Sequence, residues 1–141
     1  MATSAQYATA PGYSTATVTT AETSFTPATT NLAVLLTGTS TAAGTGVGYR
    51  INRIWLVGRG TVNGGTVRFW SSTDGGTTLV FLGDVQHTGV TAATTAESFK
   101  MDVPFLANVT IPGSTAGNAF RIYMGTSVTN TIVGHVWYGA L

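Results

Sequence analysis

Charged side chains are scarce in this sequence, and cysteine is absent altogether. Lysine, arginine, aspartate and glutamate make up 8% of the 141 residues, against about a quarter in an average soluble protein. The absence of cysteine excludes disulfides and thiolate metal ligands. The small number of ionisable groups also leaves little material for acid–base or metal chemistry. We therefore expect a protein that is not an enzyme and that carries no cofactor.

Neither sign of charge dominates, because six basic residues stand against five acidic ones and the formal net charge is +1. Nucleic-acid-binding domains usually carry a clear basic excess, so no nucleic-acid partner is expected. No apolar run approaches the ~20 residues that a membrane helix needs. The first residues also lack the basic and apolar segments of a secretory signal. We expect neither insertion into a membrane nor Sec-dependent export.

Threonine, alanine, serine and glycine stand where most soluble proteins carry charge. A free monomer usually covers its surface with lysine and glutamate. A surface that lacks them is typical of a protein packed against copies of itself or against a larger assembly. A homo-oligomer is therefore expected.

Residues 1–30 differ from the rest because they are rich in threonine and almost free of charge. The run Thr15–Thr20 disfavours a helix, since β-branched side chains are stiff at χ1. A disordered tail would usually carry more charge and fewer aromatics. We predict an extended N-terminal arm over residues 1–30 that lies on a neighbour, followed by one domain over residues 31–141. First strands of the domain itself, or a free tail, are the alternatives.

From residue 31 onward, alternating apolar and polar residues between glycine-rich turns predict strands. The turns Asn63-Gly64-Gly65 and Asp74-Gly75-Gly76 predict a three-stranded meander. Residues 39–48 are small and glycine-rich and predict a loop. The expected strands are Leu32–Thr37, Tyr49–Arg59, Thr66–Ser72, Thr78–Val85, Ser98–Val103, Leu106–Ile111, Asn118–Gly125 and Thr129–Tyr138.

Short strands at this spacing, without any convincing helix, indicate an all-β, single-domain β-sandwich or jelly roll with an extended N-terminal arm. Several strands are apolar on both faces, whereas one apolar face is enough for a sandwich. The second face then requires a cover, and a neighbouring subunit is the simplest one.

No motif in the sequence predicts catalysis. Asp84 and His87 suggest a catalytic triad, but no serine lies in the G-x-S-x-G pattern. Both His87 and His135 are more typical of structural or interface residues. A metal site made from these histidines and a carboxylate stays open, although their spacing favours no particular metal.

Arginine and tryptophan lie together on the two expected strands around residues 49–72. These residue types are the ones most enriched at interface hot spots. Trp55, Trp70 and Trp137 also suggest a carbohydrate-stacking platform, although no Asp/Asn pair accompanies them in the sequence. The candidate interface residues are Tyr7, Tyr13, Phe25, Arg50, Arg53, Trp55, Arg59, Arg68, Trp70 and Trp137.

Several segments resemble small β proteins encoded among the virion genes of tailed bacteriophages. The resemblance covers roughly residues 48–141. It lies in the strand and turn residues of Tyr49–Trp55, Gly60–Phe69, Gly75-Gly76, Leu82–Val85 and Asn130–Leu141.

This resemblance implies a capsid decoration (cement) protein or a related virion component, often trimeric and jelly-roll-like. It implies a homotrimer that contacts the major capsid protein or another virion protein, and it supplies no catalytic residue. The threonine-rich N-terminal segment departs from the common pattern. The alternative hypothesis is a carbohydrate- or receptor-binding module of a phage tail fibre or spike.

Overall fold

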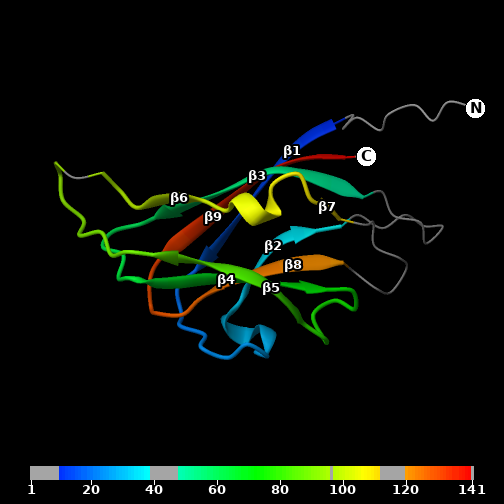
Figure 1. The fold of residues 1–141 in the computed structure, drawn as a ribbon, viewed down its shortest axis with the longest axis horizontal. Helices are drawn as coiled ribbons and strands as arrows, with labels where there is room; N and C mark the ends of the chain where they lie inside the picture. The colour runs from blue at the N-terminus through cyan, green and yellow to red at the C-terminus, as the bar shows by residue number, and fades with distance from the viewer. Residues whose placement is uncertain (1–9, 39–47, 96, 112–119, 141) are drawn as a thin grey trace, which may run out of the picture.

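Alternating apolar and polar residues build two antiparallel sheets that lie one above the other (Figure 1). The computed structural model describes residues 10–38, 48–95, 97–111 and 120–140. Within these residues the protein is all-β, and the helical content is limited to two single-turn 3₁₀ helices, η1 (Thr29–Asn31) and η2 (Pro104–Leu106).

The first sheet, sheet A, has the strand order β1-β9-β3-β6, and β7 also pairs with β3. All of these pairings are antiparallel. Strands β6 and β7 both pair with β3, at different positions along it, and η2 lies between them in the chain. The strands are β1 (Ala10–Val18), β3 (Tyr49–Gly58), β6 (Lys100–Asp102), β7 (Thr110–Ile111) and β9 (Ile132–Ala140).

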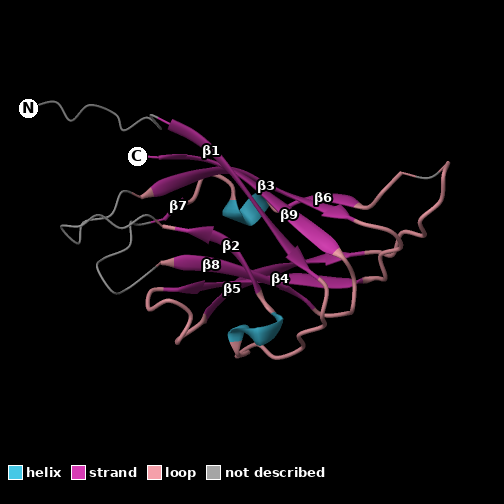
Figure 2. Cartoon of the chain, turned by 180° about the vertical axis from the view of Figure 1, so that it is seen from behind, coloured by secondary structure: helices cyan, strands magenta, loops and turns pink. Residues whose placement is uncertain are grey.

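The second sheet, sheet B, has the strand order β2-β8-β4-β5 and is also antiparallel. Figure 2 shows the same two layers from behind. Apart from β4 and β5, the paired strands are not consecutive in the chain, so most pairings join segments far apart in the sequence. The strands are β2 (Ala33–Thr37), β4 (Gly65–Ser72), β5 (Val80–His87) and β8 (Arg121–Thr126).

The core lies between the inner faces of the sheets. Sheet A contributes Ile51, Ile54 and Val136, and sheet B contributes Leu35 and Phe69, all of which are fully or almost fully buried. Burial of such side chains stabilises the fold by roughly 1.5–3 kcal/mol each. The expectation of an all-β fold is therefore confirmed.

Strand β1 overturns the predicted N-terminal arm where the structure describes it. All nine residues of Ala10–Val18 pair with β9, and Val18 is buried in the core. The expected boundary at residue 31 is therefore wrong, because residues 10–30 belong to the same body as the rest of the chain. The alternative, that this region supplies the first strand of the domain, is the correct one. Residues 1–9 lie outside the described part.

The predicted three-stranded meander is half right. The turn Asp74-Gly75-Gly76 does join β4 to β5 as a hairpin, but β3 and β4 belong to different sheets. In the connection between β3 and β4, the backbone of Asn63 is bound by the side chain of Asn130. Its amide nitrogen donates to the carbonyl of Asn63 at 2.9 Å, and its oxygen accepts from the Asn63 N–H at 2.7 Å. These two hydrogen bonds fix the connection from β3 to β4, which passes from one sheet to the other where a hairpin turn was predicted.

The other expected strands are found at shifted or shortened bounds. In the region predicted as Ser98–Val103, Phe99 and Val103 are buried while Lys100 and Asp102 are exposed, as the alternation indicates. The ladder ends at Pro104, where η2 begins. The expected strand Leu106–Ile111 is reduced to β7, because η2 occupies its start. The predicted loop at residues 39–48 lies almost entirely outside the described residues.

The segment between β1 and β2, residues 19–32, lies across the outer face of sheet B, and we call it the strap. Its backbone joins the sheet where the Glu22 N–H donates to the Thr126 carbonyl at 2.7 Å. A Cβ atom on Gly125 would lie 2.7 Å from the Leu32 side chain and 3.1 Å from that of Trp70. A larger residue at position 125 would therefore force these two side chains to shift.

Candidate functional site

An exposed group of aromatic and charged side chains lies on the outer face of sheet A, and we call it the aromatic face. Its members come from four neighbouring strands, because residues that alternate along a strand share one face. In the register of the sheet, Trp137 lies between Tyr13 and Arg53, and His135 lies opposite Trp55. The aromatic face consists of Tyr13, Arg53, Trp55, Asp102, His135 and Trp137.

The rings at the centre of the aromatic face are held together. The ring centroids of Tyr13 and Trp137 lie 5.3 Å apart, and those of His135 and Trp137 lie 6.0 Å apart with an interplanar angle of 25°. The Tyr13 hydroxyl is hydrogen-bonded to His135 Nδ1. Nevertheless, Tyr13 is 52% exposed and Trp137 is 40% exposed. The cluster is therefore ordered by its own contacts and still accessible to a partner.

A paired arginine and aspartate border these rings. Arg53 Nε donates to Asp102 Oδ1 at 2.7 Å and Arg53 Nη2 donates to Oδ2 at 3.3 Å, which is a two-pronged pair. The guanidinium carbon also lies 4.3 Å from the centroid of the Trp55 ring. The hydrogen bond that Arg53 donates to Asp102 raises the pKa of Arg53 above its ordinary value. The rim of the aromatic face therefore has donors and acceptors but no net charge.

A second exposed region surrounds strand β5, which is an edge strand of sheet B. Val80 is 59% exposed, and Phe81 and Leu82 are each 38% exposed. The Phe25 ring packs edge-on against Phe81 with centroids 5.2 Å apart. Phe105 lies on the other side, since a Cβ on Gly83 would be 3.1 Å from its ring. We call this region the edge patch: Phe25, Val80, Phe81, Leu82 and Phe105.

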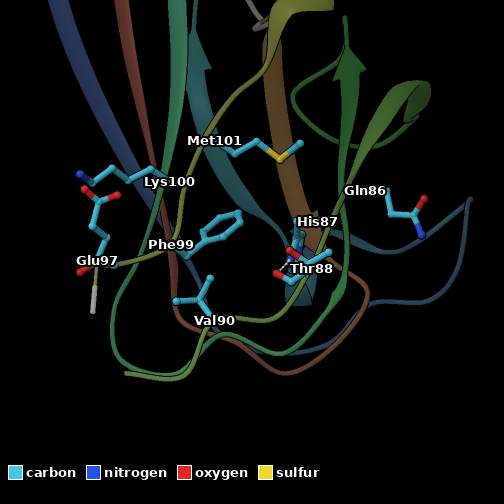
Figure 3. A pocket seen from close by; sticks show the side chains of 9 residues that line it. Gln86, His87, Thr88, Val90, Glu97, Phe99, Lys100 and Met101 are labelled. Carbon is cyan, nitrogen blue, oxygen red and sulfur yellow. Dashed lines mark hydrogen bonds between the residues drawn. The ribbon is translucent and has the colours of Figure 1, made fainter. Parts of the chain in front are cut away.

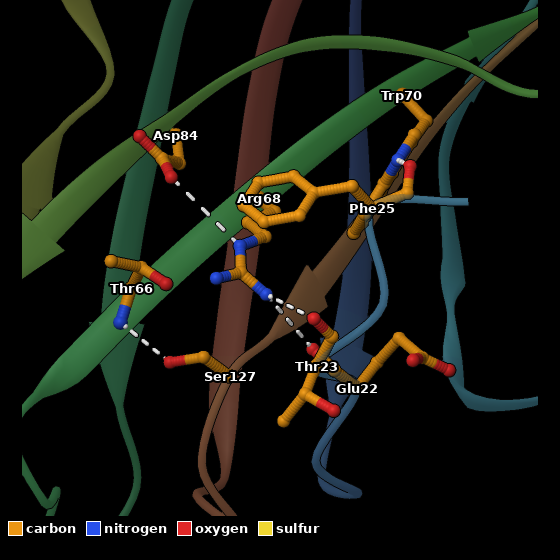
Figure 4. Close-up of polar contacts among 8 residues, drawn as sticks. All are labelled: Glu22, Thr23, Phe25, Thr66, Arg68, Trp70, Asp84 and Ser127. Carbon is orange, nitrogen blue, oxygen red and sulfur yellow. Dashed lines mark hydrogen bonds and ion pairs between the residues drawn. The ribbon is translucent and has the colours of Figure 1, made fainter. Parts of the chain in front are cut away.

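Two of the predicted interface residues, Arg68 and Trp70, are used inside the molecule, where the strap covers them (Figure 4). Trp70 is completely buried, and its indole N–H donates to the Phe25 carbonyl at 3.0 Å. Arg68 donates to the carbonyls of Glu22 and Thr23 at 3.4 and 3.1 Å. The expectation of a stacking platform that includes Trp70 is therefore wrong.

The remaining predicted interface residues are scattered. Arg50, at the start of β3, donates to Asn108 Oδ1 at 3.1 Å. Arg59 is exposed just beyond the end of the same strand. Tyr7 lies outside the described residues. Of the predicted set, the structure brings together Tyr13, Arg53, Trp55 and Trp137 on the aromatic face.

An open cleft of about 450 Å³ lies between the end of β5 and the segment around β6 (Figure 3). The His87 ring packs on that of Phe99 at a centroid distance of 4.9 Å, and its Nε2 is buried without a hydrogen-bond partner. Glu97 and Lys100 are exposed at the rim. Because Nε2 is buried, it is not exposed to the open space of the cleft. Its lining is Gln86, His87, Thr88, Val90, Glu97, Ser98, Phe99, Lys100 and Met101.

The structure separates the two histidines considered as metal ligands. His87 is buried at the end of β5, whereas His135 lies on the outer face of sheet A. Among the described residues, no group of three histidine, cysteine, aspartate or glutamate side chains is arranged to hold a metal ion. No helix in the described part is long and apolar enough to cross a membrane.

Asp102 as a partner of the tryptophans, and most of the edge patch, were not predicted from the sequence. Asp102 is 47 positions from Trp55 in the chain, and only the pairing of β3 with β6 places them opposite each other. The signal for the edge patch was present, because Val80-Phe81-Leu82 is an apolar run without lysine or proline. Such a run on an edge strand invites pairing with another chain.

Comparisons of the chain with protein-family models, with curated proteins and with solved structures found no match, so no family is assigned and the function rests on the two exposed regions.

Proposed function

We propose that this protein is a non-enzymatic structural component of a bacteriophage virion, a capsid decoration protein that associates through the edge patch. The proposed fold is a β-sandwich of the jelly-roll type. Its support is the strand order, in which β1-β9-β3-β6 faces β2-β8-β4-β5. Double-sheet jelly rolls of eight strands occur among viral capsid domains, although a fold does not by itself identify a function.

The edge patch is the observation that carries the proposal. Five large apolar side chains gather along an edge strand in a chain where only 8% of residues are charged. Natural edge strands are usually protected by lysine, proline or a covering segment. Strand β5 has neither lysine nor proline between Val80 and His87. A soluble monomer seldom leaves such a region open.

The partner proposed for the edge patch is a second copy of the chain, within a homotrimer that also contacts the major capsid protein. A few well-packed side chains near the centre of an interface supply most of its binding free energy, and aromatic residues are enriched there. Many such contacts repeated by symmetry hold a shell protein through avidity, without one tight site. The resemblance to phage virion proteins over roughly residues 48–141 supports the same assignment.

The oligomeric mass in solution tests this proposal directly. We expect the wild-type chain to be oligomeric in size-exclusion chromatography with light scattering at micromolar concentration. Leu82→Lys places a charge in the edge patch and should yield monomers. The matched control is Val34→Lys, because Val34 on β2 is equally exposed at 39% and lies outside the patch. This control should keep the wild-type mass.

Binding to the virion is measured by co-sedimentation with head shells of a phage that encodes the chain. Wild type should sediment with the shells, and Leu82→Lys should remain largely in the supernatant. A wild-type chain that is monomeric and does not sediment would refute the proposal. A Leu82→Lys variant with unchanged mass would exclude the edge patch as the interface between copies.

A further inference from the structure

We propose that the aromatic face of sheet A binds a carbohydrate and that its ligand is a neutral pyranose. The inference does not rest on the virion function, because it concerns a different surface. A pyranose ring has an apolar C–H face and polar hydroxyl edges. A matching site therefore needs an exposed flat ring with hydrogen-bonding groups beside it, and both are present on the aromatic face.

The stacking surface is provided by Trp137 and Tyr13. Both rings project from paired strands in the interior of a register that is continuous over nine residues, so their backbone positions are fixed. The hydrogen bond to His135 further restrains Tyr13. Side chains of this kind offer large contact areas at little cost in conformational entropy. Tyr13 is 52% exposed and Trp137 is 40% exposed, and among the described residues no segment lies above them as the strap lies above Trp70.

The hydrogen-bonding groups are those of Arg53 and Asp102. Their mutual pairing uses Nε and one Nη2 hydrogen, and the carboxylate oxygens keep lone pairs for further donors. Sugar hydroxyls both donate and accept, so they fit a rim that offers both functions. Because the two charges cancel, the site favours a neutral sugar over an anionic one. The chain's net charge of +1 likewise gives no preference for nucleic acid.

A second copy of the chain is a poorer occupant for this face. Packing two such faces together would remove the Arg53–Asp102 pair from water, at a desolvation cost that its mutual attraction does not reliably offset. In the monomer the side chains of Arg53 and Asp102 are 53% and 51% exposed. The edge patch has no charged member and is better suited to contact between copies. The two surfaces thus differ in the kind of partner that they fit.

The test measures sugar binding by the full-length protein. A glycan array identifies sugars that bind, and the disaccharides lactose, maltose, cellobiose and chitobiose are then titrated individually. Binding is followed by ¹H–¹⁵N NMR shifts and by tryptophan fluorescence. At least one neutral sugar should bind with shifts centred on β1, β3 and β9. Trp137→Ala should weaken binding by about tenfold or more, which corresponds to the loss of one good contact.

Two further variants separate binding from folding. Trp137→Phe retains an aromatic ring and should restore part of the affinity. Val34→Ala shortens an equally exposed apolar side chain on sheet B, outside the edge patch, and should leave affinity unchanged. Thermal unfolding of every variant checks that the fold is intact. Three results would each overturn the inference: the wild-type protein binds none of the neutral sugars, Trp137→Ala leaves sugar binding unchanged, or Trp137→Ala changes only the oligomeric mass.

Discussion

The outer faces of the two sheets have similar residues but different surroundings. On each face an arginine lies two residues before a tryptophan: Arg53 and Trp55 on sheet A, Arg68 and Trp70 on sheet B. Each face also has an aromatic residue from the N-terminal region, Tyr13 on sheet A and Phe25 on sheet B. On sheet B the strap buries Trp70 completely, whereas on sheet A Trp137 remains 40% exposed. The comparison shows that a face that is apolar in sequence is covered either by the chain itself or by something else. On sheet A the rings around Trp137 are open to a partner, whereas the open rings on sheet B, Phe25 and Phe81, lie at the β5 edge.

The largest effect should come from removing the tryptophan that the strap covers. Trp70→Ala leaves a cavity under the strap and removes a hydrogen bond, so we expect a loss of about 3–5 kcal/mol in the free energy of unfolding. Trp137→Ala on the open face should cost less than about 1 kcal/mol. Urea unfolding of the two variants measures the difference. Equal losses would mean that the open face is also covered within the monomer.

The close approach of the strap can be tested at Gly125. A valine there would place its Cβ 2.7 Å from the Leu32 side chain and 3.1 Å from that of Trp70, so the contact between strap and sheet must shift. We expect a loss of about 1–3 kcal/mol and faster proteolysis within residues 19–32. The control is Thr15→Val on the open face of β1, which keeps a β-branched shape. If Gly125→Val is as stable and as protease-resistant as wild type, the strap is not held against sheet B.

Two arginines, one on each face, allow a smaller comparison. Arg68 has a side chain that is only 13% exposed, and it donates to two strap carbonyls while its guanidinium lies 4.4 Å from the Phe25 ring centroid. Arg68→Ala should cost about 1.5–3 kcal/mol, because two strap carbonyls lose a charged donor. Arg53→Ala should cost about 0–1 kcal/mol, as exposed ion pairs do.

Chemical denaturation measures both losses, and a double-mutant cycle can separate the strap contact from the rest. Arg68→Ala combined with Phe25→Ala should be less destabilising than the sum of the two single changes, because the side chains touch. Strict additivity would indicate that the contact between Arg68 and Phe25 contributes nothing. The pair Arg53→Ala and Phe25→Ala lies on opposite sheets and should be additive.

The local parts of this structure were predictable from the sequence. The hairpin of β4 and β5 follows from Asp74-Gly75-Gly76, and the inward side chains Phe99 and Val103 follow from strict alternation. Both depend on neighbours in the chain, so a short window of sequence contains the needed information. An all-β fold follows from the same kind of evidence.

The predictions that failed concern contacts between segments that are distant in the sequence. Trp55 and Trp70 have the same alternation in sequence, but residues 19–32 cover only Trp70. The turn at Asn63 was expected to reverse the chain within one sheet, yet the side chain of Asn130, 67 positions away, holds it between the sheets. Similarly, Asp102 joins the aromatic face only through the register of β6 on β3. No local pattern contains these pairings.

The smallest effect concerns the turn beside the strap and depends on pH. Asp74 Oδ1 accepts from the Thr78 N–H at 2.8 Å and from the Ser72 hydroxyl at 2.7 Å. These hydrogen bonds, that from Thr78 first, lower its pKa from 3.8 to about 2. Because the folded-state pKa is depressed, the stabilisation is complete above the unfolded pKa and is lost as the pH falls through about 2.

Asp74→Asn should therefore have a lower Tm than wild type at pH 6, and the gap should narrow as the pH falls from 4 to 2. The other carboxylates titrate in both proteins, so their contribution cancels in the difference. The neighbouring change Thr73→Ser should leave the Tm unchanged at every pH. A gap that stays constant over this range would mean that the Asp74 charge does not stabilise the turn.

The turn and the strap meet where a Cβ on Gly76 would be 3.1 Å from the Thr29 methyl. Proteolysis of the strap should therefore follow the same pH dependence.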